Sequence, residues 1–418
     1  MFDLDRWQEI FSALSKNKVR TFLTAFGVFW GIFMLLVMMG SGDGLEKGAK
    51  KDFGSFATNA LYMWTQSTSK PYKGLPPGRG FNFNNSDTEA MRQNVEGISL
   101  LCPRNQLGGY RGENNVIRGK YTGAFSVYGD VPNIIKVDPL DIFNGRFLNE
   151  NDIKEKRKVC VVGKRVYDLL FEPNEDPIGE YIQINGVYFQ VIGVYNQPIK
   201  NNASERDLEN IYIPFTTFQQ AFNYGNIVGW YCITANPDVR VSELFDNVFT
   251  VLADRHKIHP EDKRAIGSWN SEKEFLKLND LFTGINFLIW IVGIGTLLAG
   301  VIGVSNIMLV VVKERTKEIG IRKAIGANPY SIISQIILES TFLTSIAGYV
   351  GLLFGVLVIE VVNNLVGTSA GMFLNPQIDF NIAITATIIL VIAGALAGLI
   401  PAQKAAAVNP VMALRNET

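Results

Sequence analysis

Apolar residues in this chain are concentrated in four blocks, at 21–42, 283–312, 329–362 and 381–403. Only one of the blocks contains charged residues, namely Glu339 and Glu360. A run of about 18 or more apolar residues is long enough to cross a bilayer as a helix. The pattern therefore predicts four transmembrane helices, with residues 45–280 forming a large domain between the first and the second.

A short charged segment, 313–328, separates the second span from the third. A link of this length holds the two helices antiparallel and presents its charges on one side of the membrane. Gly320 and Gly326 are expected to interrupt helical structure here. Asn328 and Pro329 predict the start of the third span, because Asn is a good N-cap and Pro is favoured at the first helical position. Four residues add apolar surface to the segment: Ile319, Ile321, Ala324 and Ile325.

Positive charge is distributed unevenly among the short connections. Lys and Arg occur before the first span, in 313–328 and in the tail 404–418, whereas the loop 363–380 has neither. Because positive charge accumulates on the cytoplasmic side, both termini and 313–328 are expected inside the cell, and 45–280 outside. Residues 1–20 carry apolar side chains at helical spacing among charged ones, which predicts an amphipathic helix on the inner membrane surface.

The long segment 45–280 has the signals of a mixed α+β domain. Alternating apolar runs flank Asn185 and Gly186, a pair that favours a β-hairpin. Ser86 to Glu89 has the capping-box pattern of a helix start, and the Ser-, Gly- and Pro-rich stretch 65–85 is expected to be a mobile loop. Further strands are predicted at 159–162, 211–213 and 231–234, and helices at 164–171 and 241–252.

The sequence offers no catalytic constellation. His256 and His259 are the only histidines. They are interpreted as surface residues at a helix end rather than as metal ligands, because no Cys or carboxylate pattern completes a ligand set. Three cysteines, Cys102, Cys160 and Cys232, fit three buried thiols better than one disulfide with a free thiol. No phosphate-binding loop occurs, so ATP hydrolysis by that route is not expected of this chain. Nor is a nucleic-acid partner expected.

Small residues recur four apart in all four spans, a spacing that lets helices approach closely in lipid. This predicts a tightly packed helix assembly that includes a subunit interface. Glu339 lies inside the third span and is interpreted as a structural contact, with force relay or ion binding as the alternative. The glycines predicted to pack helices or join subunits are Gly27, Gly31, Gly295, Gly303, Gly351, Gly355, Gly394 and Gly398.

Several motifs resemble one known family over nearly the whole chain. The most specific runs from Glu314 to Ala327, and others lie at 17–24 and 398–415. Outside the spans, the motifs are residues 144–147, 161–163 and 176–179, followed by the hairpin at Asn185. Together they resemble the permease subunits of MacB/FtsX-class (type VII) ABC transporters.

That resemblance implies a multi-pass inner-membrane permease, not an enzyme, with a porter-like extracytoplasmic half and an inserted lobe at about 105–225. It would work as a dimer, with itself or with a related subunit, and with two copies of a cytoplasmic ABC ATPase that carries ATP and Mg. MacB itself has its ATPase on the same chain. This chain begins at the amphipathic helix, so a separate ATPase is expected. The docking residues would be Arg315, Glu318, Ile321, Arg322 and Lys323.

In this class the segment between the second and third spans passes ATP-driven motion to the extracytoplasmic domain, a mechanism called mechanotransmission. The favoured function is efflux with a periplasmic adaptor and an outer-membrane duct. Lipoprotein extraction by LolC/LolE-like relatives and FtsX-like signalling to cell-wall hydrolases are the alternatives.

Overall fold

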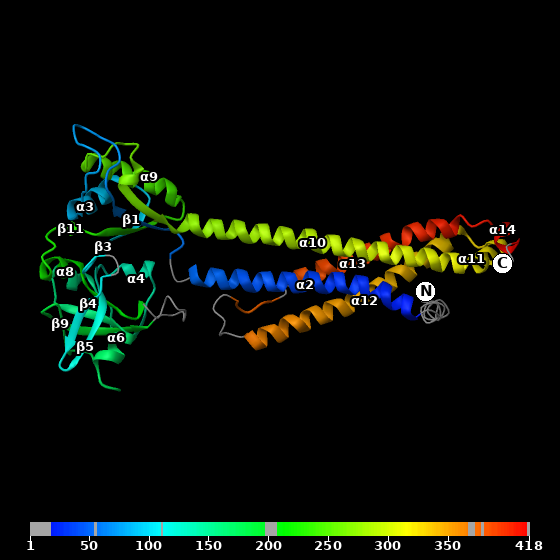
Figure 1. Ribbon diagram of the computed structural model, residues 1–418, viewed down its shortest axis with the longest axis horizontal. Helices are drawn as coiled ribbons and strands as arrows, with labels where there is room; N and C mark the ends of the chain where they lie inside the picture. Colours follow the sequence, from blue (N-terminus) through cyan, green and yellow to red (C-terminus); the bar gives the residue numbers. More distant parts are fainter. Residues whose placement is uncertain are drawn as a thin grey trace. The chain divides into compact units, whose positions relative to one another are not determined.

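The computed structural model describes residues 18–53, 57–109, 112–196, 207–366, 373–377 and 380–415. Its contacts divide into two units, one of Met1–Lys50 with Asp280–Thr418 and one of Lys51–Asn279. Many of the helices and strands of both are labelled in Figure 1. The amphipathic helix predicted at 1–20 and much of the loop 363–380 lie outside the described residues.

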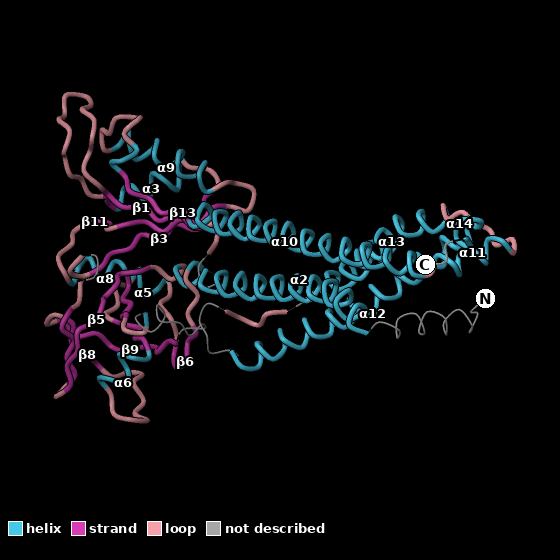
Figure 2. Tube along the Cα trace, turned by 45° about the vertical axis from the view of Figure 1, so that its right-hand side comes forward, coloured by secondary structure: helices cyan, strands magenta, loops and turns pink. Residues whose placement is uncertain are grey.

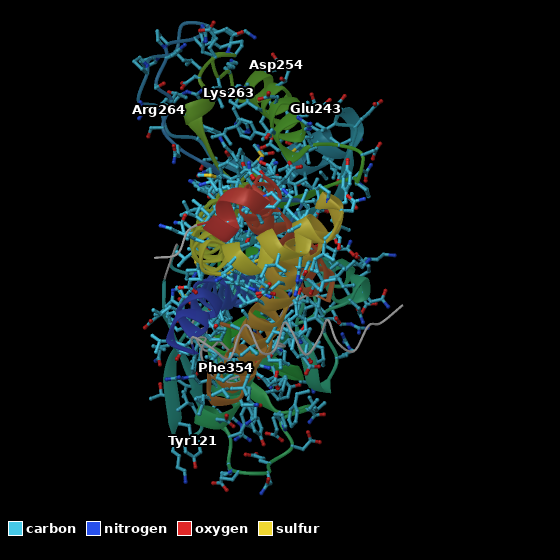
Figure 3. All side chains as sticks on the ribbon, turned by 90° about the vertical axis from the view of Figure 1, so that its right-hand side faces the viewer. Tyr121, Glu243, Asp254, Lys263, Arg264 and Phe354 are labelled. Atoms are coloured by element: carbon cyan, nitrogen blue, oxygen red, sulfur yellow. The ribbon has the colours of Figure 1, made fainter. Side chains whose placement is uncertain are left out.

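Four long helices of the first unit are long and apolar enough to cross a membrane, which confirms the predicted spans. They are α2 (Lys18–Phe53), α10 (Ser271–Glu314), α12 (Pro329–Val366) and α13 (Phe380–Ala406). Large apolar side chains remain exposed along them, such as Phe354 of α12 (Figure 3). Such exposure suits lipid rather than water. The described part of the unit also has two short helices, α11 (Thr316–Ala324) and α14 (Pro410–Arg415).

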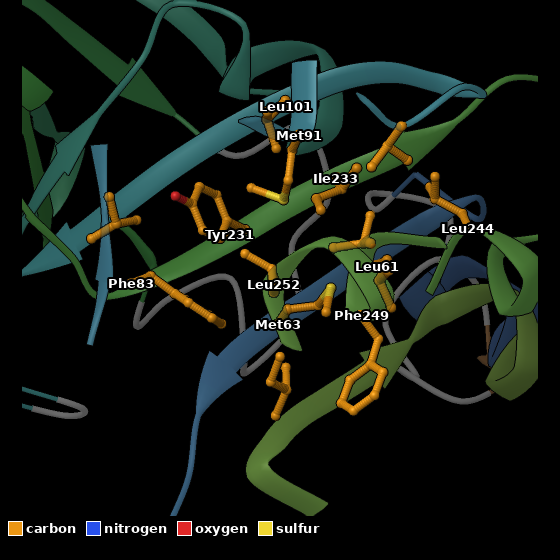
Figure 4. Close-up of a cluster of buried hydrophobic side chains, with 14 of the residues drawn as sticks. Leu61, Met63, Phe83, Met91, Leu101, Tyr231, Ile233, Leu244, Phe249 and Leu252 are labelled. Carbon is orange, nitrogen blue, oxygen red and sulfur yellow. The ribbon is translucent and has the colours of Figure 1, made fainter. Parts of the chain in front are cut away.

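The extracytoplasmic unit is α+β, and most of its strands form one sheet of two halves with separate cores. The first half combines β1 (Ala60–Thr65), β3 (Ile98–Gln106), β12 (Trp230–Ala235) and β13 (Ile266–Asn270) with α3 (Asn85–Asn94) and α9 (Val241–Arg255). Helix α9 buries its apolar stripe, including Leu244 and Leu252, against Leu61 and Met63 of β1 (Figure 4). A two-stranded sheet of β2 (Phe83–Asn84) and β11 (Ile227–Val228) and the 3-10 turn η1 (Lys263–Ala265) complete this half.

The second half contains a closed barrel, which the sequence did not predict. Pairing of β5 with β10 closes a ring in the order β5, β10, β7, β9, β8 and β4. These strands are β4 (Asn114–Arg118), β5 (Tyr121–Asp130), β7 (Val159–Gly163), β8 (Tyr181–Ile184), β9 (Val187–Asn196) and β10 (Asn210–Pro214); β5, β8 and β9 are labelled in Figure 2. Closure leaves the ring without free edges. Also in this half are β6 (Asp141–Gly145), which pairs with β9, and the helices α4 (Ile134–Val137), α5 (Glu150–Lys154), α6 (Lys164–Leu170) and α8 (Phe215–Ala221).

The two halves meet where β3 pairs briefly with β5, at Asn105 opposite Gly129 and Gln106 opposite Tyr128. Beside this joint, Arg104 binds Asp130 through two hydrogen bonds, of 2.7 and 2.9 Å. Both side chains are buried, so the pair cannot be broken by removing one partner without leaving a buried charge.

Most predicted local elements are confirmed, including the hairpin turn, where Asn185 and Gly186 both have positive φ. Three cysteines are buried free thiols, as interpreted. The capping box was predicted at Ser86 to Glu89, and this position is wrong. Asn84 caps α3, and Asp87 completes the box. His256 is not a surface residue, because its ring binds the buried carboxylate of Asp87 at 2.7 Å.

The stretch 65–85 was predicted to be mobile, and the structure shows it tied to the rest of the unit. Ser69 donates its backbone N–H to the Asp262 carboxylate at 2.6 Å. Arg79 donates to the carbonyl oxygen of His256 at 2.6 Å. Buried or shared hydrogen bonds of this kind fix a loop that lacks helix or strand.

Candidate functional site

The charged segment between α10 and α12 folds as a helix, α11, after a break at Arg315. Gly320 does not interrupt this helix, contrary to the sequence prediction. A Cβ at Gly320 would lie 2.5 Å from the Cβ of Ala413 in α14. The glycine is therefore required by close helix packing rather than by a turn. Gly326, with φ of 100°, follows the helix end as predicted.

Ion pairs hold one face of α11 against α12. Arg315 binds Glu318 at 3.1 Å and Glu339 of α12 at 3.4 Å. The guanidinium group of Arg322 donates one hydrogen bond to the Glu318 carboxylate and one to the side-chain oxygen of Gln335 in α12, both at 2.9 Å. A guanidinium group can serve two acceptors at once because its donors form a rigid fork.

These polar side chains surround a cavity of about 30 Å³. That volume suits a single water molecule and no substrate. Glu339 is almost fully buried and binds Arg315, which supports the interpretation of Glu339 as a structural contact. The described residues include no group of three or more His, Cys, Asp or Glu side chains suited to a metal ion.

Lys323 connects α11 to the end of α13. Its ammonium group donates hydrogen bonds to the carbonyl oxygens of Ala406, at 2.7 Å, and Val408, at 2.8 Å. Ala406 is the last residue of α13, where helix carbonyls lack partners and the helix dipole favours a cation, and Val408 lies two residues beyond it. Helix α11 is therefore attached to both of the spans that follow it in sequence.

The outer side of this region is apolar and exposed. Ile321 is 42% exposed, Ile325 82% and Tyr330 78%. An exposed apolar group of this kind, beside the cation Lys317, is typical of a protein contact surface. The sequence selected Ile321 for docking but not Ile325 or Tyr330, although Ile325 was recognised as apolar surface. Arg315, Glu318, Arg322 and Lys323 instead make internal contacts that position the helix.

The predicted packing glycines differ in their surroundings. Hypothetical Cβ atoms at Gly394 and Gly398 of α13 would lie 2.0 and 2.2 Å from the hydroxyls of Thr344 and Ser340. Gly27, Gly31, Gly351 and Gly355 also lie against neighbouring helices, Gly27 beside Gly300. Gly295 and Gly303 have no described atom within 4 Å of such a Cβ.

Nearly the whole chain is similar to known proteins. A profile for the MacB-like periplasmic core domain matches residues 21–248, and one for the FtsX-like permease C-terminal region matches residues 290–410. The macrolide export ATP-binding/permease protein MacB of Wolinella succinogenes is 29% identical over 412 residues, which cover 97% of this chain and 60% of that protein. The pyoverdine export ATP-binding/permease protein PvdT of Pseudomonas fluorescens is 27% identical, with 99% and 60% covered.

This chain thus spans about three-fifths of the length of those relatives. Among solved structures, the periplasmic region of MacB from Actinobacillus actinomycetemcomitans aligns with a TM-score of 0.43 at 19% identity. The alignment covers 55% of this chain and 96% of that periplasmic region.

Proposed function

The chain belongs to the MacB/FtsX class of ABC transporter permeases, and from this premise we propose that it passes ATP-driven motion from a cytoplasmic ATPase to its extracytoplasmic unit. The observation that carries the proposal is the exposed apolar surface of Ile321 in α11, Ile325 at the end of α11 and Tyr330 at the start of α12. An ion pair and a hydrogen bond hold α11 to α12 beside this surface. A surface that receives force must be accessible to its partner and rigid against its support.

Helix α10 provides the route for that motion. It runs without interruption from Ser271, in the extracytoplasmic unit, to Glu314, immediately before α11. A continuous helix is stiff along its axis, because each turn is hydrogen-bonded to the next. Displacement of α11 is therefore expected to act on the far end of α10.

In this proposal α11 and both termini lie on the cytoplasmic side of the inner membrane. ATP and Mg bind to two copies of a separate ATPase, and this chain hydrolyses nothing. The named relatives export macrolides or pyoverdine. That supports export of a small molecule from the extracytoplasmic side, with an adaptor and an outer-membrane duct as further partners.

A second copy of the permease, or a related subunit, is proposed to pack against α10. Gly284, Gly295 and Asn306 are spaced eleven residues apart, which is three helical turns, so they follow one line along this helix. All three are exposed, and the amide of Asn306 has no hydrogen bond to the described residues. Small residues in line with a polar one favour helix association in lipid.

Co-purification tests the proposed ATPase contact. Ile325→Asp should leave the permease in the membrane but reduce the recovered ATPase on the order of tenfold, because a buried interface contact is replaced by a charge. Arg322→Glu should act similarly, by releasing α11 from α12. Phe143→Asp, at an apolar position 65% exposed in the extracytoplasmic unit, is the matched control. Normal recovery of the ATPase with Ile325→Asp would refute the assignment.

A further inference from the structure

The extracytoplasmic barrel carries a groove for which the coupling mechanism has no use. It lies between the β8–β9 hairpin and the end of the turn 154–158, and its volume is about 660 Å³. We propose that this groove binds an acidic polypeptide segment of a partner protein.

The hairpin supplies an aromatic wall. On β8 and β9 the side chains of Ile182, Ile184 and Phe189 are fully buried in the barrel core. Because strand residues alternate between faces, Tyr181 and Tyr188 project outward, and they are 54% and 60% exposed. Tyrosines that offer this much area at small entropic cost are enriched in protein-binding surfaces.

The opposite wall is cationic. Residues 154–158 read Lys-Glu-Lys-Arg-Lys, all exposed, and Arg157 and Lys158 line the groove. Arg157 pairs with Glu155 at 2.8 Å and with the buried Asp152 at 3.6 Å. The three lysines of the turn form no ion pair with any described residue. Glu180, the acid beside Tyr181, is already paired with Arg118 at 3.2 Å. The groove therefore has positive charge left for a negatively charged occupant.

Hydrogen-bonding groups at the floor favour a polypeptide over other polyanions. Gln190 donates its side-chain N–H to the carbonyl oxygen of Gly179 at 3.0 Å, which leaves its amide oxygen to accept. The hydroxyls of Tyr181 and Tyr188 have no partner within the described part of the chain. An acidic peptide brings a regular series of backbone N–H donors together with carboxylates, whereas phosphatidylglycerol and dextran sulfate offer hydroxyl donors and no amide N–H.

This inference rests on the proposed function in one respect, since a protein that transmits motion outward needs a partner to receive it. The groove itself is defined by the extracytoplasmic unit alone. Binding can therefore be measured with the full chain in detergent and without ATPase, and ATPase recovery can be measured on the same variants.

The probe is a fluorescein-labelled peptide with the repeat Glu-Gly-Glu-Ala, followed by fluorescence anisotropy. We expect saturable binding that weakens with added salt. The double variant Arg157→Glu/Lys158→Glu should weaken it on the order of tenfold, and Tyr188→Ala by a similar factor. The double variant Lys257→Glu/Arg264→Glu, at two exposed cations on the other half of the unit, is the charge-matched control and should bind as the wild type does.

Three results would overturn the proposal. One is binding unaffected by the groove variants, and another is equal loss with Lys257→Glu/Arg264→Glu. The third is tighter binding of phosphatidylglycerol vesicles or dextran sulfate than of the peptide, with the same dependence on Arg157 and Lys158. Failure of the proposed function would look different, because the wild-type chain would then recover no ATPase while peptide binding persisted.

Discussion

Asp138 is a carboxyl group that the fold holds in an unfavourable setting. It lies at the C-terminal end of α4, half-buried, and no described group donates a hydrogen bond to its carboxylate. Burial raises the pKa of Asp138 to about 6, and the nearby acids Asp207 and Asp130 add to this, while Arg104 opposes it. Folding therefore shifts Asp138 toward its neutral form relative to the unfolded chain.

The sign of the pH dependence follows from this shift. A folded-state pKa above the unfolded value of 3.8 means that the folded state binds more protons, so Asp138 costs stability as the pH rises from about 4 through 6. Asp138→Asn should raise the free energy of unfolding on the order of 1–2 kcal/mol above pH 6. The gain should shrink toward zero near pH 4. Thermal melting of both proteins in detergent, as a function of pH, measures the difference, and a gain that grows on acidification would contradict it.

Single residues mark the limit of what the sequence could predict. Ser86 and Asn84 are both good helix caps, and only the pairing of β2 with β11 decides which one starts α3. Gly320 was interpreted as a helix breaker. Its tight contact with Ala413 could not be predicted, because the two positions lie far apart in sequence. The charges of 313–328 were recognised, but their division into internal ties and exposed surface depends on where α12 places Gln335 and Glu339.

At the scale of elements, the contact between α12 and α13 depends on glycine. Ser340 of α12 donates to the carbonyl oxygen of Gly394 at 3.0 Å. A Cβ at Gly398 would lie 2.2 Å from that serine oxygen, which cannot move away without losing its hydrogen bond.

Gly398→Ala should therefore destabilise the protein by about 1–2 kcal/mol, since the overlap outweighs the gain of roughly 1 kcal/mol in helix propensity. Gly284→Ala in α10 is the matched control when the chain is monomeric in detergent, because no described atom lies within 4 Å of the added Cβ and the proposed subunit contact is then absent. Only the propensity gain should appear there. Thermal unfolding in detergent distinguishes the two, and equal melting temperatures would show that the contact carries no close packing.

Elements differed in how far the sequence determined them. The four spans were predicted because long apolar runs have few alternatives in water or lipid. The Asn185–Gly186 hairpin was predicted because its turn needs two residues that accept positive φ. The barrel was missed, since its closure depends on the parallel pairing of β5 with β10, whose strands are separated by most of the second half.

At the scale of the whole molecule, the open face of α10 predicts an interface between permease subunits. With Gly295→Cys, oxidation should join two chains through a disulfide, because Gly295 faces open space on α10. Val304→Cys, at a fully buried position on the same helix, should not cross-link. Electrophoresis without reductant reads out the result. Absence of a two-chain product with Gly295→Cys, in membranes where the permease is active, would exclude a symmetric contact through this face.

The central claim is that α11 and the residues after it receive force from an ATPase, and site-specific photo-cross-linking in intact cells tests it most directly. A photoreactive amino acid replaces Ile325, and in a parallel strain it replaces the control residue Phe143. The account predicts a covalent adduct with an ATP-binding protein at position 325 and none at position 143. An adduct with that protein at 143, or its absence at 325 while transport persists, would contradict the account.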